Sequence, residues 1–189
     1  EIAIEIGGNN NEIRLNNIVN STSGAGGGAI YVIGDSTIIE SNNITNTFAK
    51  GHSGAVQVNG DKTKINNNRF IETTSTNTGG ALYLIGSEIS VTHNIFNNNI
   101  AKTSSGGAIY INSNGVNDFV NCTFIGNKIT ASSQKNGGAI YVNEVSGQNN
   151  FIGCTFINNT ATGYGGAIAT ASGKAITNID KSVFITNTA

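Results

Sequence analysis

The chain has 189 residues, including 25 Gly and no Pro, Met or Trp, and only 11% of the residues are charged, with a formal net charge of -1. Nucleic-acid-binding proteins gather Lys and Arg on one face, so this composition argues against a nucleic-acid partner. No segment approaches the ~20 consecutive apolar residues of a membrane span, so we expect no span within this chain.

A Gly-Gly-Ala motif followed by alternating apolar residues recurs from one end of the chain to the other. The glycine before the alanine falls at residues 28, 54, 80, 107, 138 and 166, with steps of 26, 26, 27, 31 and 28. A period in the twenties is typical of solenoid proteins, in which each repeat is one turn of a continuous stack.

We expect three short strands in each repeat. The first follows the glycines, as in residues 29–33, where strand alternation places Ile30 and Val32 in the core. The second is a β-branched segment such as 37–39 or 63–65, and the third carries another repeated motif around an apolar residue. The outward position of the first strand predicts an aromatic column of Tyr31, Tyr83, Tyr110 and Tyr141.

Corners and insertions separate these strands. Asn-rich corners lie at residues 16–17, 42–43, 67–68 and 93–94, and we expect their Asn residues to adopt the left-handed conformation that a tight corner needs. Extra residues near 130–136 and 145–149 are expected to form loops that leave the strands in register.

Stacked turns bring equivalent residues to within about 4.8 Å of each other, so the third strand predicts two structural ladders. One is a buried aromatic column of Phe70, Phe96, Phe124, Phe156 and Phe184. The other is a hydrogen-bonded ladder of Asn99, Asn127, Asn159 and Asn187.

The predicted fold is therefore all-β: a parallel β-helix of about seven turns, with residues 1–189 as one solenoid domain. An α-solenoid fits poorly because no stretch shows a period of 3.6 residues. The absence of Pro favours stacked strands, since Pro would remove a hydrogen bond from each ladder. Neither end carries a cap, so we expect the ends to meet flanking repeats of a longer chain or other copies of this chain.

Few residues suggest catalysis or metal binding. Asp35 and Asp61 are 26 residues apart and should lie on neighbouring turns, either as turn residues, which we favour, or as a catalytic carboxylate pair. His52 and His93 occupy different repeat positions, so we expect no catalytic residue, metal site or cofactor.

The remaining charged residues are expected at the surface. Arg14 and Glu40 should form an exposed ion pair. Lys50 and Lys102 share one repeat position two turns apart and are expected to be solvated.

Two cysteines and four sequons are candidate modification sites. Cys122 and Cys154 should lie on adjacent turns, as stacked buried thiols or as a disulfide, because the spacing between turns suits a bridge. Asn-x-Ser/Thr sequences mark possible glycosylation at Asn20, Asn43, Asn121 and Asn158.

The two motifs together resemble a known repeat. Residues 106–109 and 137–140 read Gly-Gly-Ala-Ile, and 124–127 and 156–159 fit Phe-x-x-Asn. This pair is similar to the chlamydial-type polymorphic outer membrane protein repeat, which is also found in adhesin-like surface proteins of other microbes. The resemblance implies a right-handed parallel β-helix on a cell surface, with adhesion as the usual role.

We therefore predict a non-enzymatic, extracellular structural or adhesive module of a microbial cell-surface protein. One alternative is a subunit of a head-to-tail surface fibre. Another is a carbohydrate-binding or carbohydrate-active β-helix similar to pectin lyases, in which exposed Tyr and Asn contact host or surface glycans. The fold by itself does not decide between these roles.

Overall fold

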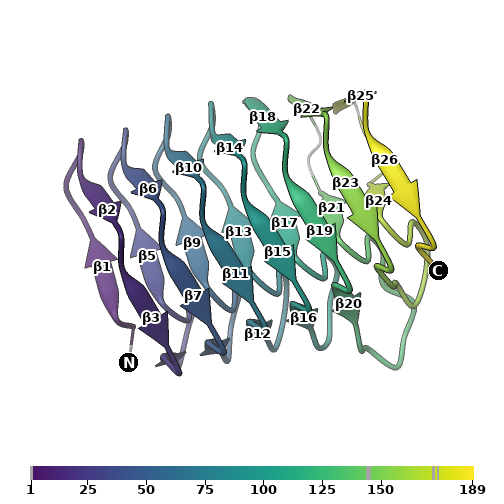
Figure 1. Cartoon of the computed structure of the whole chain (residues 1–189), viewed down its shortest axis with the longest axis horizontal. Coiled ribbons are helices and arrows are strands. Elements are labelled where there is room, and N and C mark those ends of the chain that lie inside the picture. The colour runs from purple at the N-terminus through teal and green to yellow at the C-terminus, as the bar shows by residue number, and fades with distance from the viewer. Residues whose placement is uncertain (1, 144–145, 172, 174) are drawn as a thin grey trace.

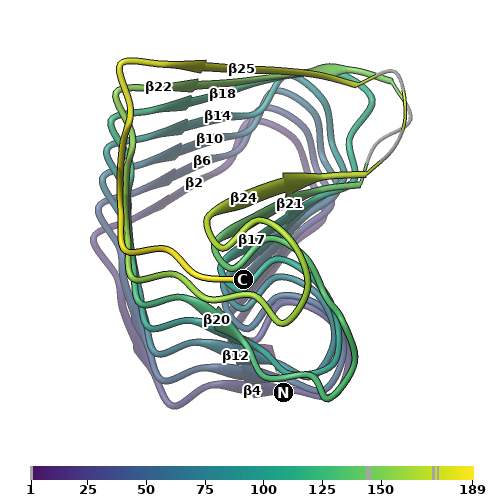
Figure 2. The ribbon, with the colours of Figure 1, turned by 90° about the vertical axis from the view of Figure 1, so that its right-hand side faces the viewer.

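The computed structural model describes residues 2–143, 146–171, 173 and 175–189. Its regular elements in these ranges are all β-strands, which pair in parallel into four sheets. Successive turns follow one another along a single axis (Figure 1), and the view along that axis shows the sheets around a common interior (Figure 2). The predicted β-solenoid of about seven turns is confirmed.

The first sheet follows the double glycines. In its strands the first and third residues point inward, so that Ile30 and Val32 are fully buried while Tyr31 is half-buried, as predicted. The strands pair in register from turn to turn, for example Ile30 with Val56. The sheet contains β1 (Ile4–Ile6), β5 (Ile30–Val32), β9 (Val56–Val58), β13 (Leu82–Leu84), β17 (Ile109–Ile111), β21 (Ile140–Val142) and β24 (Ile168–Thr170).

The second sheet lengthens in its last three turns, where the expectation of a loop at 145–149 was partly wrong. Gln148 and Asn149 belong to β22, and Asn117 on the preceding turn donates from Nδ2 to Asn149 Oδ1 at 3.2 Å. The added residues therefore extend the strand pairing; Val145 lies outside the described residues. The sheet contains β2 (Glu12–Arg14), β6 (Ile38–Glu40), β10 (Lys64–Asn66), β14 (Ser90–Thr92), β18 (Val116–Val120), β22 (Gln148–Ile152) and β25 (Ile176–Asp180).

The third sheet carries the Phe motif. Its central residue points inward, and Phe70 pairs in register with Phe96 and Phe96 with Phe124. The insertion at 130–136 contains no strand, and β19 and β23 on either side of it remain in register. The sheet contains β3 (Asn17–Val19), β7 (Asn43–Thr45), β11 (Arg69–Ile71), β15 (Ile95–Asn97), β19 (Thr123–Ile125), β23 (Thr155–Ile157) and β26 (Val183–Ile185).

A fourth sheet adds a short strand to five of the turns, beyond the three strands expected in each turn. Its strands have two residues each and lie where the sequence suggested a corner. The second residue is small in the first four strands and points inward, as Ala49 and Ala101 do, so the chain stays extended for one more pair of hydrogen bonds. The sheet contains β4 (Thr22–Ser23), β8 (Phe48–Ala49), β12 (Thr74–Ser75), β16 (Ile100–Ala101) and β20 (Lys128–Ile129).

The corner between the second and third sheets differs in part from expectation: Asn67 has the positive φ expected of a corner Asn, but at the other predicted corners a residue of a different type has it. The residue with positive φ precedes the buried Asn: it is Ser41 before Asn42 (φ 56°) and Asn67 before Asn68 (φ 54°). The preceding residue turns the chain because the buried Asn side chain is held inside by hydrogen bonds to adjacent turns. At the first corner even Leu15 takes this conformation, with φ 58°.

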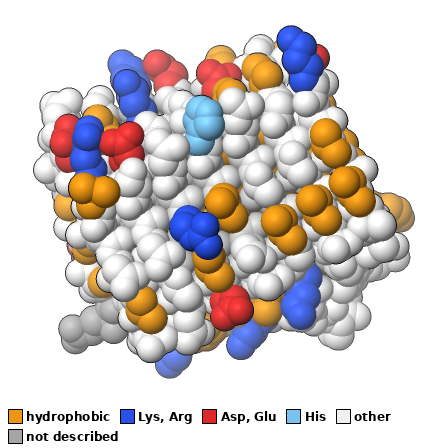
Figure 3. Space-filling view, in the orientation of Figure 1, with side chains coloured by type: hydrophobic (Ala, Val, Ile, Leu, Met, Phe, Trp, Pro, Cys, Tyr) orange, Lys and Arg blue, Asp and Glu red, His pale blue; other side chains and the backbone are white. Residues whose placement is uncertain are grey.

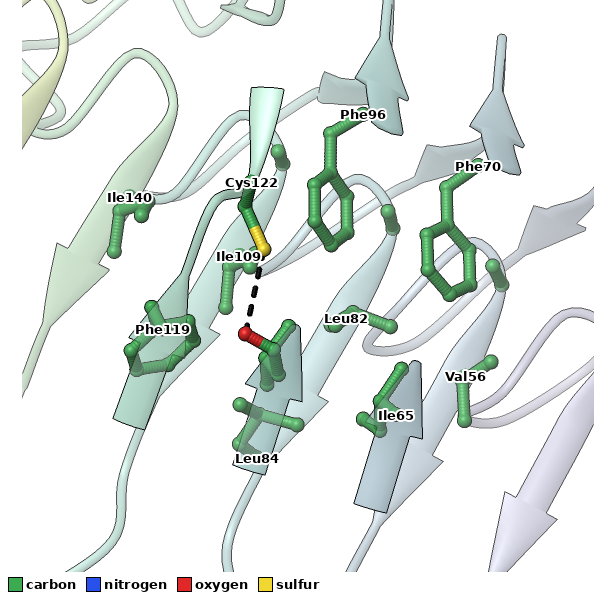
Figure 4. Close-up of a cluster of buried hydrophobic side chains, with 14 of the residues drawn as sticks. Val56, Ile65, Phe70, Leu82, Leu84, Phe96, Ile109, Phe119, Cys122 and Ile140 are labelled. Atoms are coloured by element: carbon green, nitrogen blue, oxygen red, sulfur yellow. Dashed lines mark hydrogen bonds between the residues drawn. The ribbon is translucent and has the colours of Figure 1, made fainter. Parts of the chain in front are cut away.

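The interior is filled by apolar columns that run along the axis. Figure 4 shows side chains from the first three sheets meeting there, among them Leu82, Ile65 and Phe96. Phe119 and Phe151 on the second sheet form an aromatic pair, with ring centroids 4.7 Å apart, that the sequence analysis did not identify. Burying a Phe side chain completely stabilises the folded chain by roughly 1.5–3 kcal/mol. Because the neighbouring turns cover these rings, contacts between turns hold the stack together.

Candidate functional site

The predicted Phe column runs down the third sheet. Its rings are stacked with centroids 4.7–4.9 Å apart and nearly parallel planes. Four of the five residues are fully buried, whereas Phe184 on the last described turn is 46% exposed. The column is Phe70, Phe96, Phe124, Phe156 and Phe184.

The predicted Asn ladder follows the corner after this column. Asn127 Nδ2 donates to Asn159 Oδ1 at 2.9 Å and to the Phe96 carbonyl at 3.0 Å. Asn127 Oδ1 in turn accepts from both the backbone N–H and the Nδ2 of Asn99. The same pattern continues from Asn159 to Asn187, so each buried amide links three turns.

A second amide ladder, which the sequence analysis missed, lies at the opposite end of the third sheet. Asn42, Asn68 and Asn94 repeat the same bonds at intervals of 26 residues. Each of these Asn residues stands two positions before the buried central residue of a third-sheet strand. That shared position in the repeat was the signal that could have identified the ladder. These residues fix the corner between the second and third sheets.

Cys122 and Cys154 continue the second ladder in place of Asn. Both thiols are free and buried. Cys122 Sγ donates to the Val91 carbonyl at 3.3 Å (Figure 4), and Cys154 Sγ donates to the Phe119 carbonyl at 3.4 Å. Burial raises the pKa of the Cys122 thiol well above its ordinary value, because the thiolate would lose its hydration. The thiols thus substitute for buried amides.

Asp35 and Asp61 lie on neighbouring turns, and the carboxylate of each accepts a backbone hydrogen bond from the turn that follows. Asp35 Oδ1 accepts the backbone N–H of Asp61 at 2.9 Å, and Asp61 Oδ1 accepts that of Ser87 at 2.7 Å. Each carboxylate therefore fixes the corner of the following turn. Within the described ranges, no group of three or more His, Cys, Asp and Glu side chains is placed to hold a metal ion.

Several of the other charged side chains make contacts at the surface. Arg14 forms the predicted ion pair with Glu40 at 3.0 Å and also contacts Glu12 at 3.1 Å. Lys102 Nζ lies 5.1 Å from the ring centroid of Phe48, and Lys50 is exposed. These contacts are surface interactions, worth about 1 kcal/mol or less each.

The outer face of the first sheet carries an aromatic column. The ring centroids of Tyr83 and Tyr110 are 5.5 Å apart, and those of Tyr110 and Tyr141 are 5.4 Å apart. Tyr31 is not continuous with them, because Gln57 occupies the turn between Tyr31 and Tyr83. The ring of His52 extends the column instead, stacking on Tyr83 at 4.7 Å.

Amide side chains form a second row beside these rings. The Asn112 side chain partly offsets the rise that burial causes in the pKa of Tyr83, and its Oδ1 accepts from Asn143 Nδ2 at 3.1 Å. One turn after Tyr31, Asn59 Nδ2 donates to the Tyr31 hydroxyl at 2.9 Å. We call Tyr83, Tyr110, Tyr141, Asn112 and Asn143 the Tyr–Asn face.

The Tyr–Asn face is uncharged. Burial, followed by the neighbouring Tyr141 and Tyr83, raises the pKa of Tyr110 to about 12, so its hydroxyl stays protonated at neutral pH. Burial also lowers the pKa of His52, whose Nδ1 lies 2.6 Å from the Thr78 hydroxyl. The face therefore offers aromatic surface and hydrogen-bonding groups without a fixed charge.

A cavity opens next to the Tyr–Asn face. It has a volume of about 310 Å³ and a mainly apolar lining that includes Tyr31, His52 and Gln57. His52 lines this cavity. The other histidine of the chain, His93, lies at an exposed corner, with its Nε2 3.3 Å from Asn121 Nδ2.

The third sheet presents a different surface. Figure 3 shows apolar side chains in a row across this side of the molecule. Ile125, Ile157 and Ile185 occupy one outward position of β19, β23 and β26 and pair in register. Thr123 and Thr155 flank this row, and Asn97 holds the equivalent outward position on β15, next to Ile125.

The four sequons lie at corners or strand ends. Asn20, Asn121 and Asn158 are exposed with positive φ, and Asn43 is half-buried, donating from Nδ2 to Asn17 Oδ1 at 2.8 Å. Glycosylation at these residues remains a prediction.

Comparison with known proteins identifies the repeat. Residues 95–112, 121–143 and 153–171 match the model of the Chlamydia polymorphic membrane protein repeat. No curated protein and no solved structure matches the chain. Among the described residues, no helix has the length and apolarity needed to cross a membrane. The three matched segments contain strands β15 to β17, β19 to β21, and β23 and β24, and each segment is similar to the Chlamydia polymorphic membrane protein repeat.

Proposed function

We propose that this chain is a non-enzymatic, extracellular adhesive module of a cell-surface protein. The match to the polymorphic membrane protein repeat carries this proposal, because that repeat belongs to a surface-associated family. The architecture supports it: similar side chains, such as Tyr83, Tyr110 and Tyr141, are displayed on consecutive turns along sheets held by buried ladders. A surface with repeated chemistry suits attachment to an extended partner.

A non-enzymatic role is supported by the positions of the acids. A carboxylate pair that hydrolyses a glycosidic bond must converge on substrate with its oxygens available. Asp35 and Asp61 instead bind backbone N–H groups of the next turn. We therefore expect no release of reducing sugar from neutral or acidic polysaccharides incubated with the purified chain, whereas release that is lost in Asp61→Asn would favour the carbohydrate-active alternative.

The location can be tested directly on the source cells. An antibody raised against the purified chain should label intact cells, and brief protease treatment of those cells should remove the label. Labelling that appears only after the cells are permeabilised would contradict the proposed function. An antibody against a cytoplasmic protein of the same cells provides the control for cell integrity.

Assembly through the ends of the stack is a second proposal. Val183, Phe184 and Ile185 on the last described turn are each 46–49% exposed, although Phe184 stacks on Phe156. Flanking repeats or the first turn of another copy would cover these side chains. Sedimentation velocity should show concentration-dependent association that Phe184→Lys weakens, and a constant monomer over a wide concentration range would remove the fibre alternative.

A further inference from the structure

The Tyr–Asn face repeats its chemistry along the solenoid axis. Tyr110 pairs in register with Tyr83 and with Tyr141, so one ring is presented on each of three consecutive turns. Successive turns of parallel strands rise by about 4.8 Å, which is comparable with the length of one sugar residue in an extended polysaccharide. A ligand that lies along the axis would therefore meet a similar environment at each step.

The side chains of this face match the two kinds of surface on a sugar. The C–H face of a pyranose ring packs against aromatic rings, and its hydroxyls exchange hydrogen bonds with amides. Each Asn side chain carries two N–H donors and an accepting carbonyl. The bond between Asn143 and Asn112 aligns these amides beside the tyrosine rings. Aromatic and amide groups thus run in parallel rows.

Charge narrows the class of ligand. The outward positions of the first sheet hold Glu5, Tyr31, Gln57, Tyr83, Tyr110, Tyr141 and Ala169, and Glu5 is the only charged residue in this set. No Lys or Arg is present there to attract a uronic acid, sulfate or phosphate group. The absence of Lys and Arg does not weaken the binding of a neutral ligand, whereas an anionic polymer would find no positive charge to pair with.

We infer that the Tyr–Asn face binds a neutral polysaccharide in an extended conformation along the solenoid axis, with sugar rings on Tyr83, Tyr110 and Tyr141 and hydroxyls on Asn112 and Asn143. This inference deepens the proposed function, because it names the class of surface to which the module attaches. The cavity beside His52 and Gln57 continues the binding surface toward the N-terminal turns.

Affinity electrophoresis in native gels tests the inference. The gels contain a neutral polymer (mixed-linkage β-glucan, galactomannan or arabinoxylan) or polygalacturonate as the acidic comparison. We expect at least one neutral polymer to slow the chain, and polygalacturonate to have no effect. Retardation by polygalacturonate alone, or by none of the polymers, would overturn the inference.

Variants locate the site. Tyr110→Ala should weaken binding by at least tenfold, and Ile125→Ala, on the third sheet of the same turn, is its matched control. Should Tyr110→Ala disturb the fold by circular dichroism, the Asn112→Ala/Asn143→Ala double variant decides, with a loss of several-fold expected. Binding unchanged in a folded Tyr–Asn variant would refute the site.

Tyrosine fluorescence supplies an independent readout. The chain has no Trp and five Tyr residues, three of which lie on this face, so bound polymer should change the emission of the wild type. The change should be lost in the double Asn variant along with binding. If the chain binds no neutral polymer but is still found on intact cells by antibody, this inference fails while the proposed function stands.

Discussion

The buried Asn ladder should dominate the stability of the C-terminal turns, and Asn127→Ala tests this. The Asn127 side chain makes four hydrogen bonds and is fully buried. Its removal leaves the Asn99 backbone N–H and the Phe96 carbonyl without that partner, and each such loss costs about 1–3 kcal/mol. We therefore expect the free energy of unfolding to fall by roughly 3–5 kcal/mol.

Urea unfolding followed by far-UV circular dichroism measures this loss. Asn97→Ala is the matched control, because Asn97 points outward on β15 and its replacement should cost less than about 0.5 kcal/mol. Asn127→Thr should lose less than Asn127→Ala, since the hydroxyl of Thr73 at the equivalent position lies 2.7 Å from both the Gly80 carbonyl and Asn99 Oδ1 and can donate to either. If Asn127→Ala and Asn97→Ala unfold at the same urea concentration, the ladder does not contribute as argued.

Three further predictions follow from the contacts between turns. Gly107→Ala should prevent cooperative folding, because a Cβ there would lie 2.0 Å from the Gly138 carbonyl oxygen. Gly24→Ala is its control and should unfold at the wild-type temperature, because a Cβ at Gly24 would have no atom within 4 Å. Equal melting temperatures for the two variants would contradict this prediction. The free energy of unfolding should fall as pH rises from about 10 to about 12, because Tyr110 loses its hydroxyl proton at a lower pH in the unfolded chain than in the folded one. Tyr110 is about half exposed, which limits this loss to roughly 1 kcal/mol. Urea titrations should show a smaller alkaline loss for Tyr110→Phe than for the wild type. Cys122 and Cys154 should resist Ellman's reagent in the folded chain and both react after unfolding without reductant; one equivalent or fewer would reveal oxidised thiols.

The sequence by itself determined the solenoid fold, the inward residues of the first and third strands of each turn, the Phe column and the Asn ladder that follows it. It did so because a solenoid turn buries its apolar side only against equivalent turns. The repeat period then specifies which residues stack: the spacing that aligned Phe96 with Phe124 also aligned Asn99 with Asn127. Both groups lie in strands or corners whose register never shifts.

Only the tertiary structure decided the details that depend on contacts across turns. The sequence did not show that Ser41 turns the chain instead of Asn42, because that choice follows from the buried bonds of Asn42 to Asn68. It did not show that His52 replaces Tyr31 in the aromatic column, since His52 comes from a loop and reaches the ring of the next turn. Repetition fixes which residues are equivalent, but hydrogen bonds and packing between non-equivalent positions arise only once the turns are stacked.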